Sequence, residues 1–362
     1  MESIFGQYYP IAWFFVGTVP FYFAVQRPPS FVRHALIAAN ILCILIWIRG
    51  MLEVMVPVQR AVAHGGIIIS VHTISFLVFE KGMINTAGLS LNQRLRSVFR
   101  VWANVRRLDL TNQALPSPRT RVLFLVKDSI QLLLLLAIHH LSGIGSAKAL
   151  HSLKLTMYDY GPANQTLLPA IPLESRDLIL RSLTSVRWIL ESYIILTTAH
   201  TIFAIVFVSI LGWDLPSSWP WIFGNPIEAY TLRRFWGIFW HRLTVPVANM
   251  YITKLAHLVF PDSKRGRSAL RAAGIFAFSA VCHAIVNWIM VYRSNIWQEL
   301  RFFLVNFAVC MLETQVGMGK AECGKGAVGW GRRLLGYVWV CAVFFTLAPT
   351  WQYSAISPGL GF

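Results

Sequence analysis

Three polar side chains share one face of an apolar segment in the C-terminal half of the chain. Ser279, His283 and Asn287 follow one another at intervals of four residues, with small or apolar residues between them. A helix places residues at this spacing on one face. A neutral imidazole there keeps a lone pair free to act as a general base, while Ser279 or Asn287 could hold its other nitrogen. The same residues could instead form hydrogen bonds to a neighbouring helix.

A second group of residues capable of chemistry lies some forty positions earlier. It holds four aromatic residues and a histidine within seven positions, flanked by three arginines. Trp and Arg are typical of the membrane interface. That explanation accounts for the Trp and Arg content but not for the concentration of aromatic residues beside a histidine. The residues are Arg233, Arg234, Phe235, Trp236, Phe239, Trp240, His241 and Arg242.

Both groups must be positioned by membrane helices. The chain has 362 residues, of which 56% are hydrophobic and 13% charged, which argues against a soluble, disordered or fibrous protein. A spanning helix needs about 20 mostly apolar residues. We predict an all-α, polytopic membrane protein with about eight spans, forming a single domain over residues 1–362. The predicted spans are Tyr8–Val25, Phe31–Ile48, Ala61–Phe79, Leu123–Gly143, Trp188–Leu211, Ala269–Val291, Phe302–Met318 and Leu334–Pro349.

One further segment has three possible placements. Val245–Phe260 is amphipathic and carries Lys254 and His257 among apolar residues. It could lie in the membrane interface, re-enter the membrane or form a ninth span. The first span is not expected to be a cleaved signal peptide, because it lacks a basic leader and a small-x-small cleavage site before Gln26.

The net charge of +17 is mainly a signal of membrane topology. Of the 32 Lys and Arg residues, 21 fall on one side of the predicted membrane and nine on the other. Cytosolic loops carry the excess of positive charge, so we predict that the main basic loops are cytosolic and both termini lumenal, in the endoplasmic reticulum. The glycosylation sequon at Asn164 falls in a loop assigned to the lumen. No soluble basic segment is left to bind nucleic acid.

The other ionisable residues within apolar segments have structural explanations. We expect His72 and His200 to be core histidines bonded to backbone carbonyls. The five cysteines are odd in number and lack a CxxC pair, so we predict neither a disulfide framework nor a metal site. Residues near predicted span ends, where they can reach water, are Lys127, Asp128, His139, His140 and Glu191.

The two groups together resemble a known family. Arg-Phe-Trp-Gly-x-x-Trp-His ends at His241 and Phe-x-x-Ser-x-x-x-His ends at His283. This pair of motifs resembles wax-synthase-like members of the membrane-bound O-acyltransferase superfamily, with most similarity to fungal enzymes that acetylate terpenoid and meroterpenoid alcohols. The resemblance covers residues 225–300. The chain departs from it at Ala284, where many members have Glu, and at Ile238 and Phe239, where many have a basic pair.

The resemblance implies acyl transfer from acyl-CoA, here acetyl-CoA, to the hydroxyl of a lipophilic alcohol such as a terpenoid. His283 would be the catalytic base, supported by Ser279 and Asn287, and His241 a second catalytic residue. His241 or Trp240 would donate to the developing oxyanion. No metal is required, and the expected partners are acyl-CoA, the alcohol and membrane lipids. The residues expected to bind the CoA group are Arg233, Arg234, Trp236 and Arg242.

Two other functions stay open. A membrane terpene cyclase would need an acid deep in a span, and Glu313 is the best candidate for one. A transporter would typically bring an internal repeat or paired broken helices, neither of which is visible in the sequence.

Overall fold

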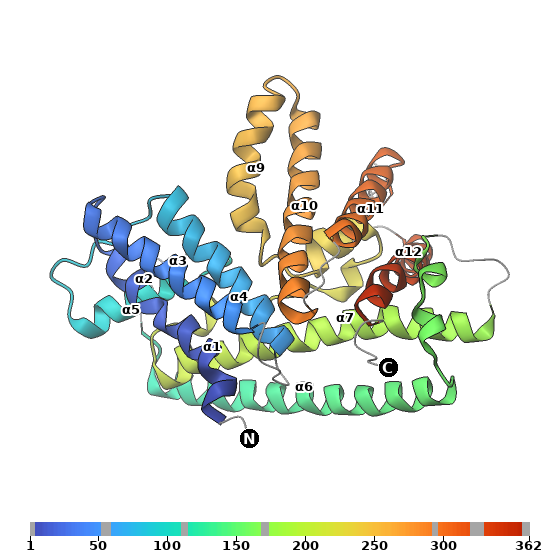
Figure 1. The fold of residues 1–362 in the computed structure, drawn as a ribbon, viewed down its shortest axis with the longest axis horizontal. Helices are drawn as coiled ribbons and strands as arrows, with labels where there is room; N and C mark the ends of the chain where they lie inside the picture. Colours follow the sequence, from blue (N-terminus) through green and yellow to red (C-terminus); the bar gives the residue numbers. More distant parts are fainter. Residues whose placement is uncertain are drawn as a thin grey trace. The chain divides into compact units, whose positions relative to one another are not determined.

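The chain folds into helices arranged in two compact units. The computed structural model describes residues 4–51, 59–109, 115–167, 174–291, 296–318 and 329–356, and every regular element in these ranges is helical (Figure 1). The all-α prediction is therefore confirmed. The first unit joins Met1–Thr111 to Leu243–Ile296, and the second joins Asn112–Arg242 to Trp297–Phe362. A single domain over residues 1–362 stays a prediction.

The first unit contains six helices from its N-terminal and C-terminal stretches and one amphipathic helix between them, counted over the described residues. They are α1 (Ile4–Val16), α2 (Thr18–Val25), α3 (Phe31–Met51), α4 (Gln59–Ile74) with its π-helical extension η1 (Ser75–Phe79), α5 (Leu91–Ala103), α9 (Val245–Val259) and α10 (Lys264–Val291).

The second unit is built around long helices and a set of short helical turns. Its elements are α6 (Pro118–Ser152), η2 (Met157–Tyr160), η3 (Pro162–Gln165), α7 (Ser175–Ala204) with its π-helical extension η4 (Ile205–Ile210), η5 (Pro216–Ser218), η6 (Pro226–Glu228), α8 (Leu232–Arg234), η7 (Phe235–Phe239), α11 (Ile296–Gln315) and α12 (Trp330–Ile356).

Six helices are long and apolar enough to cross a membrane, which confirms six of the eight predicted spans. The first predicted span is instead two shorter helices that meet at Gly17, and the seventh lies in α11, which carries three charged residues. The count of eight is therefore not confirmed. The six helices are Phe31–Met51, Val62–Phe79, Pro118–Ser152, Ser175–Ile210, Lys264–Ile289 and Trp330–Tyr353.

In the first unit, a glycine lets α4 approach α3 closely. A Cβ atom added to Gly66 would lie 2.2 Å from the Trp47 ring, and this ring is fully buried. Both helices then pack against α10 through one apolar cluster. Because the cluster draws buried side chains from three helices, it fixes α4 and α10 against each other. Its buried members are Ile44, Trp47, Met51, Ala63, Ile67, Cys282, Val286 and Ile289.

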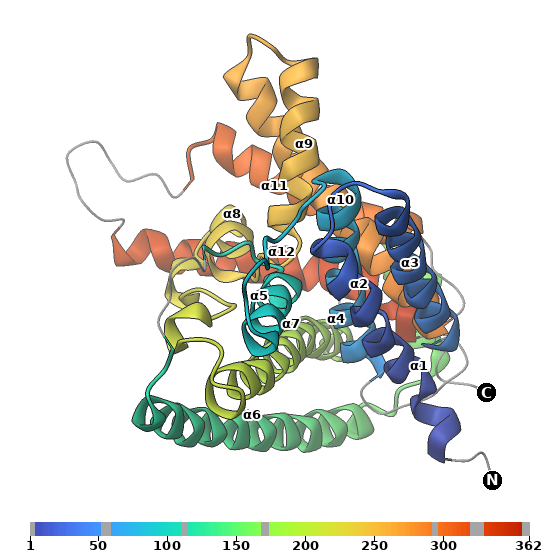
Figure 2. The same ribbon diagram turned by 90° about the vertical axis from the view of Figure 1, so that its left-hand side faces the viewer.

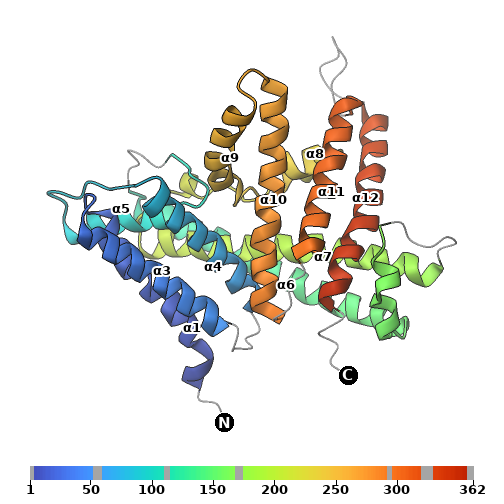
Figure 3. The same ribbon diagram turned by 45° about the horizontal axis from the view of Figure 1, so that its top comes forward.

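The helices α9 and α10 form an antiparallel hairpin (Figures 1 and 3). The Thr244 hydroxyl oxygen, just before α9, lies 3.3 Å from that of Ser279, and Arg271 donates to the Asn249 amide oxygen at 3.3 Å. The 15 residues of α9 span about 22 Å, too short to form a ninth span. The re-entrant placement and the placement in the membrane interface both stay predictions.

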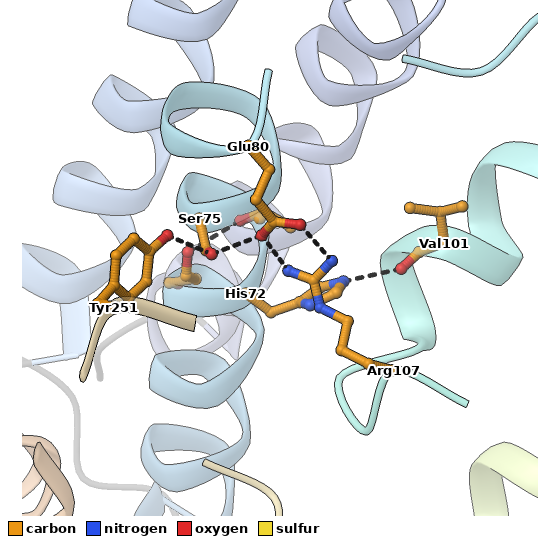
Figure 4. A network of polar contacts seen from close by, with 8 residues as sticks. His72, Ser75, Glu80, Val101, Arg107 and Tyr251 are labelled. Carbon is orange, nitrogen blue, oxygen red and sulfur yellow. Dashed lines mark hydrogen bonds and ion pairs between the residues drawn. The ribbon is translucent and has the colours of Figure 1, made fainter. Parts of the chain in front are cut away.

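A polar network fastens α9 to the end of α4 (Figure 4). The Ser75 hydroxyl lies 2.6 Å from the Tyr251 hydroxyl of α9 and donates to Glu80 at 2.7 Å. The Glu80 carboxylate also accepts two hydrogen bonds from the Arg107 guanidinium, beyond the end of α5. A bidentate pair of this kind is stronger than a neutral hydrogen bond, so the network holds α5 and α9 to the same end of α4.

The prediction for His72 is confirmed. Its imidazole is 1% exposed, and Nε2 lies 2.8 Å from the Val101 carbonyl oxygen of α5. His72 is thus a core histidine that links two helices (Figure 4). His200 packs its ring on Trp219, with 5.4 Å between the ring centroids, and its predicted backbone partner stays a prediction.

In the second unit, α6 and α7 lie side by side and antiparallel (Figures 1 and 2). The Arg121 guanidinium donates to the carbonyl oxygens of Ser209 and Ile210 at the end of η4, at 2.8 and 2.7 Å. Further along, the Gln131 amide donates to the Thr201 hydroxyl at 3.0 Å. Both helices extend well beyond the predicted spans, so His139, His140 and Glu191 lie within long helices and not at their ends.

Basic residues assigned to the lumen anchor the loop between α6 and α7. Arg181 donates to the Asn164 carbonyl oxygen at 3.0 Å, and Arg176 pairs with Asp159 at 2.7 Å. Burial alone would raise the pKa of Asp159, but hydrogen bonds from Thr156 and Arg176 outweigh it and hold that pKa below its usual value. Both of these arginines, which the sequence places on the lumenal side, thus have structural partners.

The cysteines carry no disulfide within the part of the chain that the structure describes. Cys43, Cys282, Cys310 and Cys341 are free thiols, and Cys323 lies outside the described residues.

The contact between Gly66 and Trp47 gives a matched pair of variants on one helix. Gly66→Ala would force the Trp47 ring away and should cost about 1–3 kcal/mol of stability. Gly65→Ala adds a Cβ that meets no atom within 4 Å and should leave stability unchanged or slightly raised. Thermal unfolding of the detergent-purified variants measures the difference. Equal melting temperatures for the two variants would contradict the packing described here.

Candidate active site

His283 faces a second histidine that comes from α4. The rings of His283 and His64 have centroids 5.2 Å apart and planes at 69°, an edge-to-face arrangement. Both side chains are half-buried. Sequence reasoning missed His64, because a lone histidine near one end of an apolar span carries no pattern. In the sequence, His64 looks like His72, which is a core residue. Only the packing of α4 on α10 shows that the two histidines have different surroundings.

The polar face of α10 is bordered by buried small residues. Ala280 and Ala284 are buried on one side of it, and Cys282 and Val286 on the other. Ser279, His283 and Asn287 themselves stay half-buried. The face between these residues is therefore polar and partly exposed, which suits contact with a substrate.

In the second unit, the aromatic segment is fixed at its start by a buried carboxylate. Glu313 of α11 is 1% exposed and accepts hydrogen bonds from the backbone N–H groups of Leu232 and Arg233 at 2.7 and 2.8 Å. It also accepts one from the Trp339 indole N–H of α12 at 2.9 Å. A buried charge is stable only when it is paired or hydrogen-bonded. Glu313 therefore holds the first turn of the segment against two helices.

The tryptophans of the segment pack against aromatic side chains and hydrogen-bond to a neighbouring helix. The Trp236 indole N–H donates to the Asn306 amide oxygen at 3.0 Å, and Trp240 stacks on Phe235 with 5.1 Å between ring centroids. Trp188 of α7 lies among them, 5.2 Å from Trp240 and 6.3 Å from Trp236. Large aromatic side chains bury much apolar area and prefer tilted contacts of this kind. The roles of Trp240 at an oxyanion and of Trp236 at CoA stay predictions.

His241 ends the segment in an aromatic setting. Its half-buried ring lies 5.7 Å from the Phe223 ring and 5.4 Å from the Trp240 ring, measured between centroids. Only Arg242 and Leu243 separate His241 from Thr244, which contacts Ser279. His241 belongs to the second unit and His283 to the first, so the structure groups His283 with His64, and His241 with Phe223 and Trp240.

The three arginines of the segment differ in their contacts and in their exposure to solvent. Arg234 pairs with the Glu228 carboxylate, donates to the Glu228 carbonyl oxygen at 2.9 Å and lies over the Tyr230 ring at 4.6 Å. Burial lowers the pKa of its guanidinium from the ordinary value. Arg233 is half-buried and donates to the Met318 carbonyl oxygen at 3.3 Å. Arg242 is exposed, so its side chain is the most accessible of the three to a phosphate group.

Comparison with known proteins confirms the resemblance. Residues 219–305 match the model of the Membrane bound O-acyl transferase family, a stretch that holds both His241 and His283. Together with six apolar helices, this match indicates a multi-pass membrane protein. Across the described residues, no cluster of three or more His, Cys, Asp or Glu side chains could hold a metal ion. No solved structure matches the chain.

Fungal acetyltransferases are among the relatives of the chain. It is 30% identical to the acetyltransferase ple2 of Rhodocybe pseudopiperita over 52% of this chain and 50% of that protein. It is 29% identical to the acetyltransferase eriL of Hericium erinaceus over 54% and 53%. For the acetyltransferase TRI7 of Fusarium sporotrichioides, the identity is 26% over 46% and 40%. The matched part of the chain thus spans two fifths to about half of these relatives' own length.

The contacts of Glu313 predict a loss of stability when its charge is removed. Glu313→Gln keeps the shape but replaces a carboxylate that accepts three hydrogen bonds, and should cost roughly 2 kcal/mol. Trp339→Phe removes one of the three donors and should cost about 1 kcal/mol. Melting temperatures in detergent report both effects. If Glu313→Gln melted like the unchanged protein, the carboxylate would not be holding the segment.

Proposed function

We propose that the protein is an acyl-CoA-dependent O-acyltransferase that esterifies, with an acetyl group, the hydroxyl of a lipophilic small molecule such as a terpenoid. The observation that carries the proposal is the family match over residues 219–305, because it includes both His241 and His283. The names of the relatives, which are acetyltransferases, support the acetyl group. The partly open polar face around His283 supports a reaction within the membrane.

His283 serves as the general base in this proposal. It takes the proton of the acceptor hydroxyl as the hydroxyl oxygen attacks the thioester carbonyl carbon. The new C–O bond forms, the C–S bond breaks, and the CoA thiolate leaves and receives the proton from the imidazolium. A base within hydrogen-bond reach of the hydroxyl contributes about 10²–10⁴-fold to the rate. Ser279 and Asn287, one turn to either side, help to hold the hydroxyl or the ring.

His241 and the nearby arginines serve the acyl donor. An N–H group of the His241 ring, or the Trp240 indole, donates to the oxyanion that develops at the thioester carbonyl. Arg242 is the exposed guanidinium of the segment and suits the CoA phosphates, because a guanidinium binds phosphate oxygens in pairs. Three further residues support the donor site indirectly, because their contacts hold the segment in place. They are Arg233, Arg234 and Trp236.

The proposed location is the membrane of the endoplasmic reticulum, with the large basic loops in the cytosol where CoA is found. In this placement the acyl donor approaches from the cytosol, and the lipophilic alcohol enters from the surrounding lipid. The terpene cyclase reading would assign Glu313 as an acid. Three N–H donors already occupy that carboxylate, which fits a structural role better.

Removal of the proposed base should abolish ester formation. His283→Ala is expected to lower kcat by about 10²–10⁴-fold in microsomes, while the protein still accumulates in the membrane. The assay follows labelled acetyl groups from acetyl-CoA into a lipid extract. His257→Ala is a matched control, because that histidine is exposed on α9 and bonds to the Thr253 carbonyl oxygen of its own helix. Full activity of His283→Ala would sink the mechanism.

Two arginine variants separate donor binding from folding. Arg242→Ala should raise the KM for acyl-CoA roughly tenfold, because it removes a charged donor to phosphate, and should leave the melting temperature unchanged. Arg234→Ala should instead lower the melting temperature, since it breaks the contacts with Glu228 and Tyr230. Measurement of both quantities for both variants decides the assignment. An unchanged KM for Arg242→Ala would remove this residue from the donor site.

A further inference from the structure

The proposed base His283 has a ring contact with His64, to which the proposed function assigns no role. His64 brings its ring to within 5.2 Å of the His283 ring, and the planes stand at 69°. At this centroid distance an edge-to-face pair is in contact. The two residues are far apart in the sequence, so their contact is produced entirely by the packing of α4 on α10.

The position of His64 is set by its neighbours on α4. Ala63 precedes it and Ile67 follows one turn later, and both are buried in the cluster that holds Cys282 and Val286 of α10. On the other side of the helix, Gly66 lies against the buried Trp47 ring of α3. Because α4 is held on two sides, its backbone at His64 cannot move away from α10 without disturbing the packing of three helices.

A histidine base needs a fixed ring orientation to act on a substrate hydroxyl. A displacement of a reacting group by about 1 Å can lower the rate roughly 10²-fold. An aromatic ring packed against an imidazole limits the rotation of that imidazole, and His64 supplies such a ring.

The geometry points to His64 as a positioning residue that holds the His283 imidazole in its reactive orientation through the edge-to-face ring contact. This inference rests on the proposed function, in which His283 is the base. His64 takes no proton in it and touches no reacting atom. The contribution of His64 is the planar ring, so a residue with a ring should replace it and a residue of similar bulk without a ring should not.

The first test compares two substitutions of His64 by steady-state kinetics in microsomes. His64→Leu keeps apolar bulk but removes the ring, and should lower kcat about tenfold with an unchanged KM for acetyl-CoA. His64→Phe keeps a ring and should recover most of kcat. Gly65→Ala, which adds a Cβ in open space on the same helix, is the control and should match the unchanged protein. If His64→Leu keeps full kcat, or if Phe and Leu lose equally, the inference is overturned.

A double substitution shows whether His64 acts through His283. In a His283→Ala background there is no base left to orient, so adding His64→Leu should cause no further loss of the residual activity. A merely structural role of His64 would lower the residual activity and the melting temperature again. That additional loss would overturn the inference.

A second measurement does not depend on acyl transfer. Diethyl pyrocarbonate modifies neutral imidazole nitrogens, and mass spectrometry of the His283 peptide gives the rate of its modification in intact membranes. His64→Leu should change this rate about threefold to tenfold, the effect expected from loss of an aromatic contact, and His64→Phe should not. An unchanged rate in His64→Leu would overturn the positioning role. If the unchanged protein forms no ester with any acyl-CoA, the proposed function fails, and this measurement still decides the role of His64.

Discussion

The need to satisfy polar groups within an apolar environment governs this structure. Inside a bilayer no water pairs with a backbone N–H or C=O group, so the backbone must be helical. Buried polar side chains face the same demand, and many meet it by bonding to a backbone group of another helix. The Asn40 amide donates to the Gly17 carbonyl oxygen at 2.7 Å, where α1 gives way to α2. The Ser185 hydroxyl donates to the Phe344 carbonyl oxygen at 2.9 Å and joins α7 to α12.

The same demand explains the acidic residues near the aromatic segment and the α4 terminus. Glu313 and Glu80 each accept several hydrogen bonds. Glu313 ties α8 and α12 to α11, and Glu80 ties Arg107, beyond α5, to the end of η1. Removing water from a carboxylate is costly, and several donors are needed to offset the cost. Glu313 therefore sets where the aromatic segment begins, and that segment carries residues with proposed chemical roles.

The face of α10 that carries His283 differs from these structural positions. Its polar side chains stay half-buried between small residues. His72, by contrast, is enclosed and bonded to a backbone oxygen. Two histidines in spanning helices thus differ for a physical reason. His72 is enclosed by packing, whereas His283 keeps a partly exposed ring beside the ring of His64. The distinction follows from burial and neighbours and not from residue type.

The sequence by itself determined the class of the protein, the two motifs and the nature of His72. Composition and runs of apolar residues predict membrane helices because a bilayer demands length and apolarity, which are local properties. The shared face of Ser279, His283 and Asn287 is predictable for the same reason, because helix periodicity is a property of a few consecutive turns. The same local view also made the α6 segment too short at both ends and started the α7 segment too late, because polar residues near an apolar run do not stop a helix.

Tertiary structure alone decided which side chains meet. The contact of His64 with His283, the bonds of Glu313 to Leu232 and Arg233, and the pairing of α9 with α10 all join residues that are distant in sequence or set by helix register. Arg234 and Arg242 look alike in the sequence, yet one is held by Glu228 and Tyr230 and the other is exposed. Register and burial depend on how whole helices pack, and a pattern of residue types along one helix does not contain that information.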